Sequence, residues 1–222
     1  MFDPDALAAR GLVTGSAAAG RGGATFFRLD GAELVLRRYR RGGLVRHLTR
    51  DRYLSRGAMR SRPMREFALL LELEASGLPA PRAFAARRTR HGPFESGALV
   101  THRLPGRTLA ELLVDASGNA SAPDVPWAAI GRCVARFHRA GVAHADLNAH
   151  NVLVAGAGGT PAVSLIDFDR GRRREGALPE ARARANVTRL TRSIDKVRAG
   201  AASGRDGVEV LVGAWRDSLS AR

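Results

Sequence analysis

The feature that most constrains the fold of this chain is a polar loop that runs directly into an apolar strand. The loop reads "HADLNAHNVLV" over residues 144–154 and carries Asp146 and Asn151 five residues apart. A second apolar stretch, at residues 163–166, ends at Asp167 in "SLIDFDR", sixteen residues after Asn151. Phosphoryl transfer needs a carboxylate that orients and deprotonates a hydroxyl group, together with oxygen ligands for Mg²⁺. This spacing therefore favours a phosphotransferase.

Two other interpretations of the loop remain open. Polar residues of this kind also cap helices or close turns. His144, Asp146 and His150 are residue types that ligate transition metals, but such a site leaves Asn151 and Asp167 without a role. The order of the residues along a loop and two strands favours phosphoryl transfer over both alternatives.

The first half of the chain reads as strand-rich. Residues 25–29 and 34–39 have strand composition and are separated by the turn signal "DGAE", which predicts a hairpin. A helix is predicted over residues 64–76, because apolar side chains recur near one face and Gly77 follows. Two further strands are expected in "PRAFAA" and "GALVTHRL", with a loop between them at residues 87–97.

The second half reads as mainly helical, and the boundary falls near residues 103–106. The predicted helices cover residues 109–114, 127–139, 179–198 and 208–219, with short strands at 152–154 and 163–166. The expected fold class is therefore α+β, with a sheet-rich lobe over residues 1–103 and a mainly helical lobe over residues 104–222. A hydrophobic share of 45% is enough to build packed cores.

A nucleotide site would need glycine-rich backbone, a cation and an acid in the first lobe. The run "GRGGA" supplies Gly20, Gly22 and Gly23, which we expect over the nucleotide phosphates. The only lysine, Lys196, follows the catalytic elements, so the cation on the third strand must be Arg37 or Arg38.

Strand alternation puts Arg37 on the same face as Val35 and favours it as the phosphate clamp. The expected partner on the following helix is Glu66, with Glu72 and Glu74 as alternatives. The alternative for Glu66 is a solvated residue on the helix surface.

The formal net charge of +15 indicates an anionic partner: nucleic acid, an acidic membrane surface or a phosphorylated substrate. An aromatic content of 5% and the lack of a recognisable RNA- or DNA-binding motif argue against nucleic acid. The basic runs at residues 37–43 and 171–174 either bind anions or are simply solvated. A single cysteine, Cys133, and no apolar run long enough to span a bilayer predict a soluble or peripheral membrane protein in a reducing compartment.

These residues resemble the 3-deoxy-D-manno-octulosonic acid (Kdo) kinases of the lipopolysaccharide kinase family, which have a protein-kinase-like fold. The resemblance spans about residues 20–195 and rests on "HADLNAHNVLV", "LIDFDR", "LVLRRYRRGGLVRHLTRDRYL", "REFALLLELEASGLPAPR" and "RLPGRTLAELL". Asn148 stands where protein kinases carry lysine, and Asp169 replaces the glycine of the D-F-G motif. No A-P-E motif follows, which argues against a peptide substrate.

The resemblance implies ATP-dependent phosphorylation of the 4-hydroxyl group of Kdo on Kdo-lipid A during lipopolysaccharide core biosynthesis. Asp146 would be the catalytic base, Asn151 and Asp167 the Mg²⁺ ligands, and Arg37 with Glu66 the nucleotide-phosphate clamp, with adenine near residues 101–104. The resemblance also implies a peripheral enzyme at the cytoplasmic face of the inner membrane, whose partners are an acidic glycolipid and an anionic membrane surface.

Neither nucleic acid nor a protein partner is expected. Two alternatives remain: a kinase-like phosphotransferase that acts on another sugar or on a protein, and a non-catalytic basic binding module.

Overall fold

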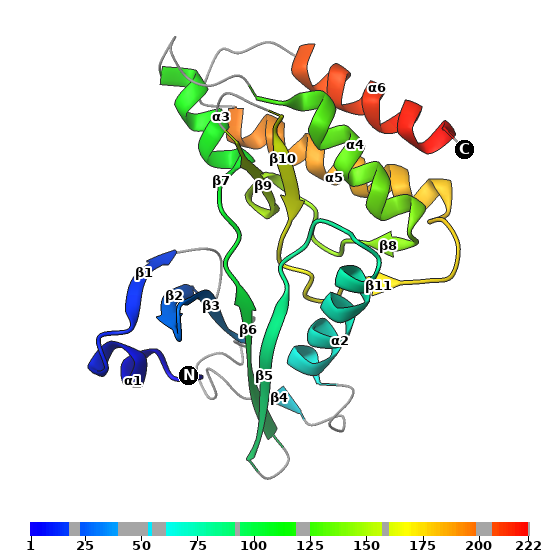
Figure 1. Ribbon diagram of the computed structural model, residues 1–222. Coiled ribbons are helices and arrows are strands. Elements are labelled where there is room, and N and C mark those ends of the chain that lie inside the picture. The colour runs from blue at the N-terminus through cyan, green and yellow to red at the C-terminus, as the bar shows by residue number, and fades with distance from the viewer. Residues whose placement is uncertain are drawn as a thin grey trace. The chain divides into compact units, whose positions relative to one another are not determined.

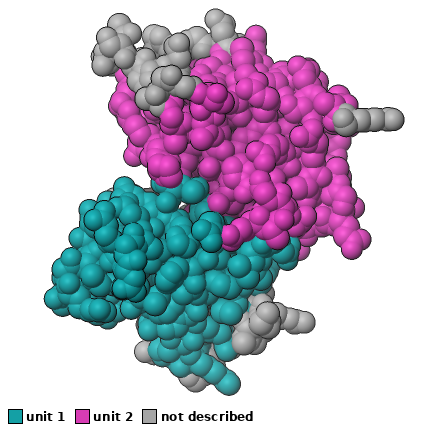
Figure 2. Space-filling view, viewed as in Figure 1, with its two compact units in different colours: residues 1–72, 81–104 teal, residues 73–80, 105–222 magenta. Residues whose placement is uncertain are grey.

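The computed structural model describes residues 1–17, 23–39, 53–54, 61–91, 94–118, 125–156, 160–198 and 206–221. The chain divides into two compact units (Figure 2): unit 1 is Met1–Glu72 with Pro81–Leu104, and unit 2 is Leu73–Ala80 with Pro105–Arg222. The segment Leu73–Ala80 thus groups with unit 2, although the sequence-based boundary assigned it to the first lobe. The reason is hydrogen bonding, because the Leu165 N–H donates to the Pro79 carbonyl and the Arg136 guanidinium donates to the Gly77 carbonyl.

Unit 1 is built on one antiparallel sheet (Figure 1). Its elements are α1 (Pro4–Ala9), β1 (Val13–Ala17), β2 (Ala24–Leu29), β3 (Ala32–Tyr39), β4 (Tyr53–Leu54), α2 (Arg62–Ala75), β5 (Ala83–His91) and β6 (Phe94–His102). The last three residues of α2 belong to unit 2. The strand order is β1-β2-β3-β6-β4, and β5 pairs with β6. Neither α1 nor β1 was predicted, because the segment around β1 lacks bulky side chains and becomes a strand by pairing with β2.

The two faces of β3 have different roles. Leu34 and Leu36 are fully buried and join a core cluster with residues of α1, β2 and β6. Alternation along the strand turns Arg37 and Tyr39 to the opposite face, where both side chains contact Glu66 of α2. The fold of unit 1 therefore separates an apolar face from a face that carries charged groups.

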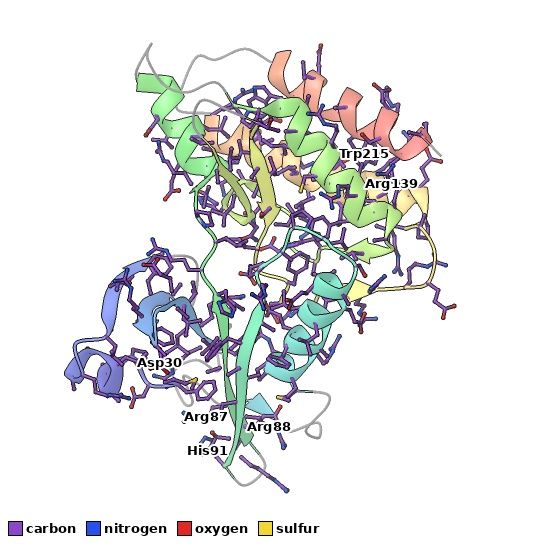
Figure 3. The ribbon with its side chains drawn as sticks, in the orientation of Figure 1. Asp30, Arg87, Arg88, His91, Arg139 and Trp215 are labelled. Atoms are coloured by element: carbon purple, nitrogen blue, oxygen red, sulfur yellow. The ribbon has the colours of Figure 1, made fainter. Side chains whose placement is uncertain are left out.

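The expected loop at residues 87–97 is wrong, because β5 and β6 continue through most of it as a long hairpin. Cross-strand pairs explain why arginine-rich sequence forms strands here. The Arg88 Nε atom lies 2.5 Å from a carboxylate oxygen of Glu95, which is buried, and the ring of His91 hydrogen-bonds to Ser96. Figure 3 labels Arg88 and His91 on this hairpin.

Unit 2 is mainly helical. Its elements are β7 (Arg107–Thr108), α3 (Leu109–Gly118), α4 (Trp127–Arg139), β8 (Val142–Ala143), the 3₁₀ turn η3 (Ala149–Asn151), β9 (Val152–Ala155), β10 (Ala162–Leu165), β11 (Arg172–Arg173), α5 (Glu180–Arg198) and α6 (Asp206–Ser220). The strands form a sheet of order β10-β9-β7 and a pair β11-β8. The α+β class predicted from the sequence is confirmed. Within the described ranges, no helix has the length and apolar character needed to cross a bilayer.

Helices α4 and α6 pack closely, and Figure 3 labels Arg139 and Trp215 on them. Ile130, Val134 and Phe137 of α4 are buried at the spacing that predicted the helix. Gly131 makes the close approach possible, because a side chain there would overlap the main chain of α6 at Leu211. This packing fixes the end of α4, which is followed by β8 and then by the polar loop at residues 144–151.

Candidate active site

The loop at residues 144–151 is closed by its own amide side chains. The Nδ2 atoms of Asn151 and Asn148 donate to the main-chain carbonyl of Asp146 over 2.9 and 3.1 Å. The side-chain Oδ1 atom of Asn148 in turn accepts from the His150 N–H over 2.9 Å. The five-residue spacing of Asp146 and Asn151 therefore has a structural basis: the amide reaches back across one turn to the residue that carries the carboxylate.

His144 joins this loop to the strand end that carries Asp167. The ring is 2% exposed, its Nδ1 atom accepts the Asp146 N–H over 3.2 Å, and its Nε2 atom lies 2.9 Å from the Ile166 carbonyl. A nitrogen that accepts an N–H carries no proton, so Nε2 is the protonated nitrogen and donates to Ile166. The Ile166 N–H donates to the Asn151 carbonyl over 3.0 Å. Asp167 is thus covalently next to a residue that is hydrogen-bonded to both ends of the loop.

Asp167 has an unusual backbone conformation. Its φ angle is 64°, in the left-handed region that residues other than glycine rarely occupy. Its carboxylate accepts the Asp169 N–H over 3.4 Å, and the neighbouring Phe168 ring is buried against the rings of His144 and Phe137. Strain of this kind persists where surrounding contacts fix the backbone, and it concentrates at functional sites.

Side chains of helix α5 hydrogen-bond to the main chain of the loop. The Asn186 side chain accepts the His144 N–H over 3.1 Å and donates to the His144 carbonyl over 3.0 Å. Two turns further along the same face of the helix, the Ser193 hydroxyl accepts the Ala149 N–H over 3.1 Å. Two polar side chains of α5 thereby satisfy buried main-chain groups of the loop, which would otherwise be costly to bury.

Behind Asn186 lies a buried histidine, His138, on α4. Its Nδ1 atom accepts the indole N–H of Trp215 over 3.0 Å, and its ring also hydrogen-bonds to the Asn186 side chain. Burial lowers the pKa of His138 to about 4, while the hydrogen bond with Asn186 acts in the opposite direction. The neutral ring therefore links α6, through α4 and α5, to the main chain of the loop.

The charged face of unit 1 holds the pair expected from the sequence. The Arg37 Nη1 atom lies 2.8 Å from Oε1 of Glu66, and the Tyr39 hydroxyl donates to Oε2 over 2.5 Å. Glu66 is buried, and the Arg37 side chain is 27% exposed. These contacts identify Arg37 as a partner of Glu66. The nucleotide-binding role of the pair remains a prediction.

The glycine-rich segment is described only in part. Gly23 has a φ angle of 58° and directly precedes β2, so it lies at the end of the connection from β1. Gly20 and Gly22 lie outside the described residues, as do residues 40–43 of the first basic run. The second basic run, Gly171–Arg174, includes β11, which pairs with β8 just before the polar loop.

The donor set of the site suits a hard cation. The carboxylate of Asp167 and the amide oxygen of Asn151 are both oxygen ligands, which Mg²⁺ prefers. No cluster of three or more His, Cys, Asp or Glu residues with metal-binding geometry occurs in the described part of the chain. Mg²⁺ typically uses one or two carboxylates together with substrate phosphates. The alternative of a transition-metal site at His144 does not fit, because both of its ring nitrogens are engaged by main-chain groups.

Sequence reasoning did not identify four residues of these contacts: Tyr39, Asn186, Ser193 and Arg189, whose Nη1 atom lies 3.7 Å from Oδ1 of Asp146. Tyr39 follows Arg37 by two positions and therefore shares its strand face, a signal that was available in principle. The polar residues of α5 are spaced three and four apart, which indicates one helix face. Nothing in that spacing tells which loop the face meets, because the contacts span more than forty residues.

Comparisons with known proteins agree on one family. The model of the lipopolysaccharide kinase (Kdo/WaaP) family matches residues 6–211. A 3-deoxy-D-manno-octulosonic acid kinase of Xylella fastidiosa strain M23 is 44% identical over 180 residues, which cover 81% of this chain and 68% of the relative. A protein with the same name from Xanthomonas axonopodis pv. citri strain 306 is 47% identical over 184 residues, covering 82% and 69%.

A solved structure of WaaP in complex with acyl carrier protein has the same fold. It aligns with a TM-score of 0.59 at 19% identity and covers 97% of this chain and 83% of that chain. At this level of identity the likeness concerns the fold, and it confirms the two-lobed kinase-like architecture predicted from the sequence.

The low pKa of His138 predicts an acid-sensitive support for the loop. Between about pH 6.5 and pH 4 the unfolded chain binds a proton at His138 that the folded chain does not bind. The free energy of unfolding should therefore fall with decreasing pH, by up to about 1.4 kcal/mol per pH unit from this group alone. Chemical denaturation across this range measures the slope. The variant His138→Gln keeps a donor and an acceptor but does not titrate. In this variant the slope of the unfolding free energy against pH should be smaller by up to about 1.4 kcal/mol per pH unit, which corresponds to one proton. Identical slopes in both proteins would refute the assignment.

Proposed function

The chain belongs to the lipopolysaccharide kinase (Kdo/WaaP) family and is therefore an ATP-dependent phosphotransferase, and we propose that its acceptor is the 4-hydroxyl group of Kdo on Kdo-lipid A. The observation that supports this most directly is the set of relatives named 3-deoxy-D-manno-octulosonic acid kinase, at 44% and 47% identity over most of the chain. The reaction would belong to lipopolysaccharide core biosynthesis.

In the proposed reaction, Asp146 orients the acceptor hydroxyl and accepts its proton. The Asp146 side chain is 68% exposed, so an acceptor can reach it, while its main chain is held by His144 and Asn151. The hydroxyl oxygen forms a bond to the γ-phosphorus as the bond to ADP breaks. The loose transition state leaves little covalent work to the protein, so placement and charge dominate.

The remaining predicted residues serve the nucleotide. Asn151 and Asp167 would hold Mg²⁺, which neutralises negative charge on the phosphates. Arg37 would contact phosphate oxygens while Glu66, itself hydrogen-bonded to Tyr39, holds the guanidinium. Gly20, Gly22 and Gly23 would pass over the phosphates, and residues 101–104 would lie near the adenine.

The sequence predicted no protein partner, but the comparison with a solved structure points to one. The neighbouring WaaP structure is a complex with acyl carrier protein, and this chain is strongly basic. We therefore propose that this chain also binds an acyl carrier protein. The glycolipid acceptor remains the substrate that we propose.

The first prediction for this reaction concerns Asp146 and the acceptor. Incubation of Kdo-lipid A with ATP and the protein should add the mass of one phosphate, and fragmentation should locate it on the Kdo 4-hydroxyl group. Asp146→Asn should lower turnover by a factor of about 10² to 10⁴, because the base is lost. Its thermal unfolding should match that of the unmodified protein, since the carboxylate is exposed.

Two outcomes would contradict this prediction, and they are distinguishable. Near-normal turnover in Asp146→Asn would reject the role of the carboxylate. Phosphate transfer to another sugar or to a protein, with none to Kdo-lipid A, would reject the acceptor while leaving the role of Asp146 intact.

The second prediction concerns the clamp in unit 1. Glu66→Gln should raise the KM for ATP by about tenfold or more, since the cation on β3 loses a charged partner worth roughly 1.5–3 kcal/mol. Glu95→Gln is the matched control, because Glu95 is also a buried carboxylate that pairs with a strand arginine, Arg88, outside the predicted site. Steady-state kinetics with ATP as the varied substrate measures both. Equal KM values in the two variants would exclude the clamp.

We also propose peripheral binding at the cytoplasmic face of the inner membrane. The net charge of +15 and the exposed arginines at residues 172–174 support it, since each basic residue near an anionic leaflet contributes about 1 kcal/mol. Vesicles that contain anionic lipid should bind the protein at low ionic strength and release it as salt is added. Binding that salt leaves unchanged would contradict an electrostatic attachment.

A further inference from the structure

One arginine outside the predicted site lies beside the carboxylate of Asp146. Arg189 on α5 places its Nη1 atom 3.7 Å from Oδ1 of Asp146. It is three residues after Asn186 and four before Ser193, so the three side chains share one face of the helix. Because Asn186 and Ser193 are hydrogen-bonded to the main chain at His144 and Ala149, the helix backbone between them is held along the loop.

The contact between Arg189 and Asp146 is loose. The two side chains are 57% and 68% exposed, and 3.7 Å is longer than a hydrogen bond. Exposed ion pairs of this kind contribute little to stability. This is also the one side-chain ion pair or hydrogen bond of Arg189 among the residues that the structure describes. A substrate that brings its own anion can therefore replace Asp146 as the partner of the guanidinium at small cost.

The loop itself offers no comparable cation. Residues 144–151 contain no lysine or arginine. Asn148, at the position where protein kinases carry lysine, uses its side chain within the loop, donating to the Asp146 carbonyl and accepting from the His150 N–H. A permanent positive charge next to the catalytic carboxylate thus comes from α5, through Arg189.

We propose that Arg189 binds a carboxylate group of the acceptor sugar and makes the enzyme selective for acidic over neutral sugars. This inference rests on the proposed function, because it assumes that the acceptor hydroxyl is the group that meets Asp146. A hydroxyl that reaches Asp146 brings the rest of its sugar ring to within a few ångströms of the guanidinium. The planar fork of arginine matches a carboxylate with two parallel hydrogen bonds.

The nucleotide is the other anion that could meet Arg189, and the contacts favour the acceptor. The terminal phosphates have Arg37 and the Mg²⁺ held by Asn151 and Asp167 as their proposed partners. Arg189 instead contacts the one side chain of the site whose task is to meet the acceptor hydroxyl. A role toward ATP is therefore an outcome that the test must separate from the proposal.

The test compares two acceptors in three proteins. The acceptors are Kdo-lipid A and the same glycolipid with its Kdo carboxylates methyl-esterified, which removes the charge and keeps the sugar. The variants are Arg189→Gln and, as matched control, Arg184→Gln. Arg184 is also an exposed arginine of α5 with a carboxylate partner, Glu180, one turn away. For each protein the KM for ATP is measured separately from the KM for the acceptor.

The unmodified protein and Arg184→Gln should use the acid about 10 to 100 times more efficiently than the ester, as kcat/KM. In Arg189→Gln this preference should fall to within about threefold, with the KM for ATP unchanged. A fourth protein, the variant Arg189→Lys, keeps the charge but loses the fork and should retain part of the preference. Calorimetric titration with free Kdo and its methyl ester gives the same comparison without turnover.

Each contrary result has one meaning. If Arg189→Gln keeps the preference for the acid in both kinetics and binding, the proposal is wrong. If its KM for ATP rises while the preference stays, Arg189 serves the nucleotide and the proposal is wrong. If the unmodified protein transfers no phosphate to Kdo-lipid A, the proposed function fails, and the titration still decides whether Arg189 recognises a sugar carboxylate.

Discussion

The interaction on which the site depends is the pair of hydrogen bonds made by the ring of His144. One nitrogen holds the N–H of Asp146 and the other holds the carbonyl of Ile166, the residue before Asp167. A single buried ring thereby fixes the distance between the two segments that carry the proposed base and metal ligand. Since the ring must accept on one side and donate on the other, only its neutral form, protonated at Nε2, satisfies both partners.

The support of that ring extends far from the loop. Asn186 of α5 binds both main-chain polar groups of His144, His138 of α4 binds Asn186, and Trp215 of α6 binds His138. Every member is a neutral donor or acceptor, so the chain of contacts requires no buried charge. It does require that three helices pack in register, which the close approach of α6 to Gly131 makes possible. The geometry of the loop therefore depends on the packing of the helical core.

Whether a feature of the fold or site could be predicted from the sequence depends on how far apart in the sequence the contacting residues are. The spacing of Asp146 and Asn151 and the strand end at Asp167 are local patterns, and they were predicted. The hairpin at residues 87–97 was missed because its arginines are balanced by cross-strand partners such as Glu95, which only the register reveals. Asn186 and Arg189 were missed for the same reason, since they meet the loop across more than forty residues of sequence. The proposed acceptor comes from the family resemblance, because no local pattern indicates it.

In each of the two units an arginine, not a lysine, supplies the cation beside a carboxylate: Arg37 beside Glu66 and Arg189 beside Asp146. On β3, a guanidinium pairs with one oxygen of Glu66 while Tyr39 takes the other, so the buried carboxylate is satisfied on both sides. Beside Asp146, the charge stands on α5 instead of on the loop. Arg189 is held beside the loop, because Asn186 and Ser193 of the same helix hydrogen-bond to the main chain of the loop. The proposed recognition of the acceptor therefore depends on the same hydrogen bonds that hold the base in place, and weakening either contact of α5 should disturb both at once.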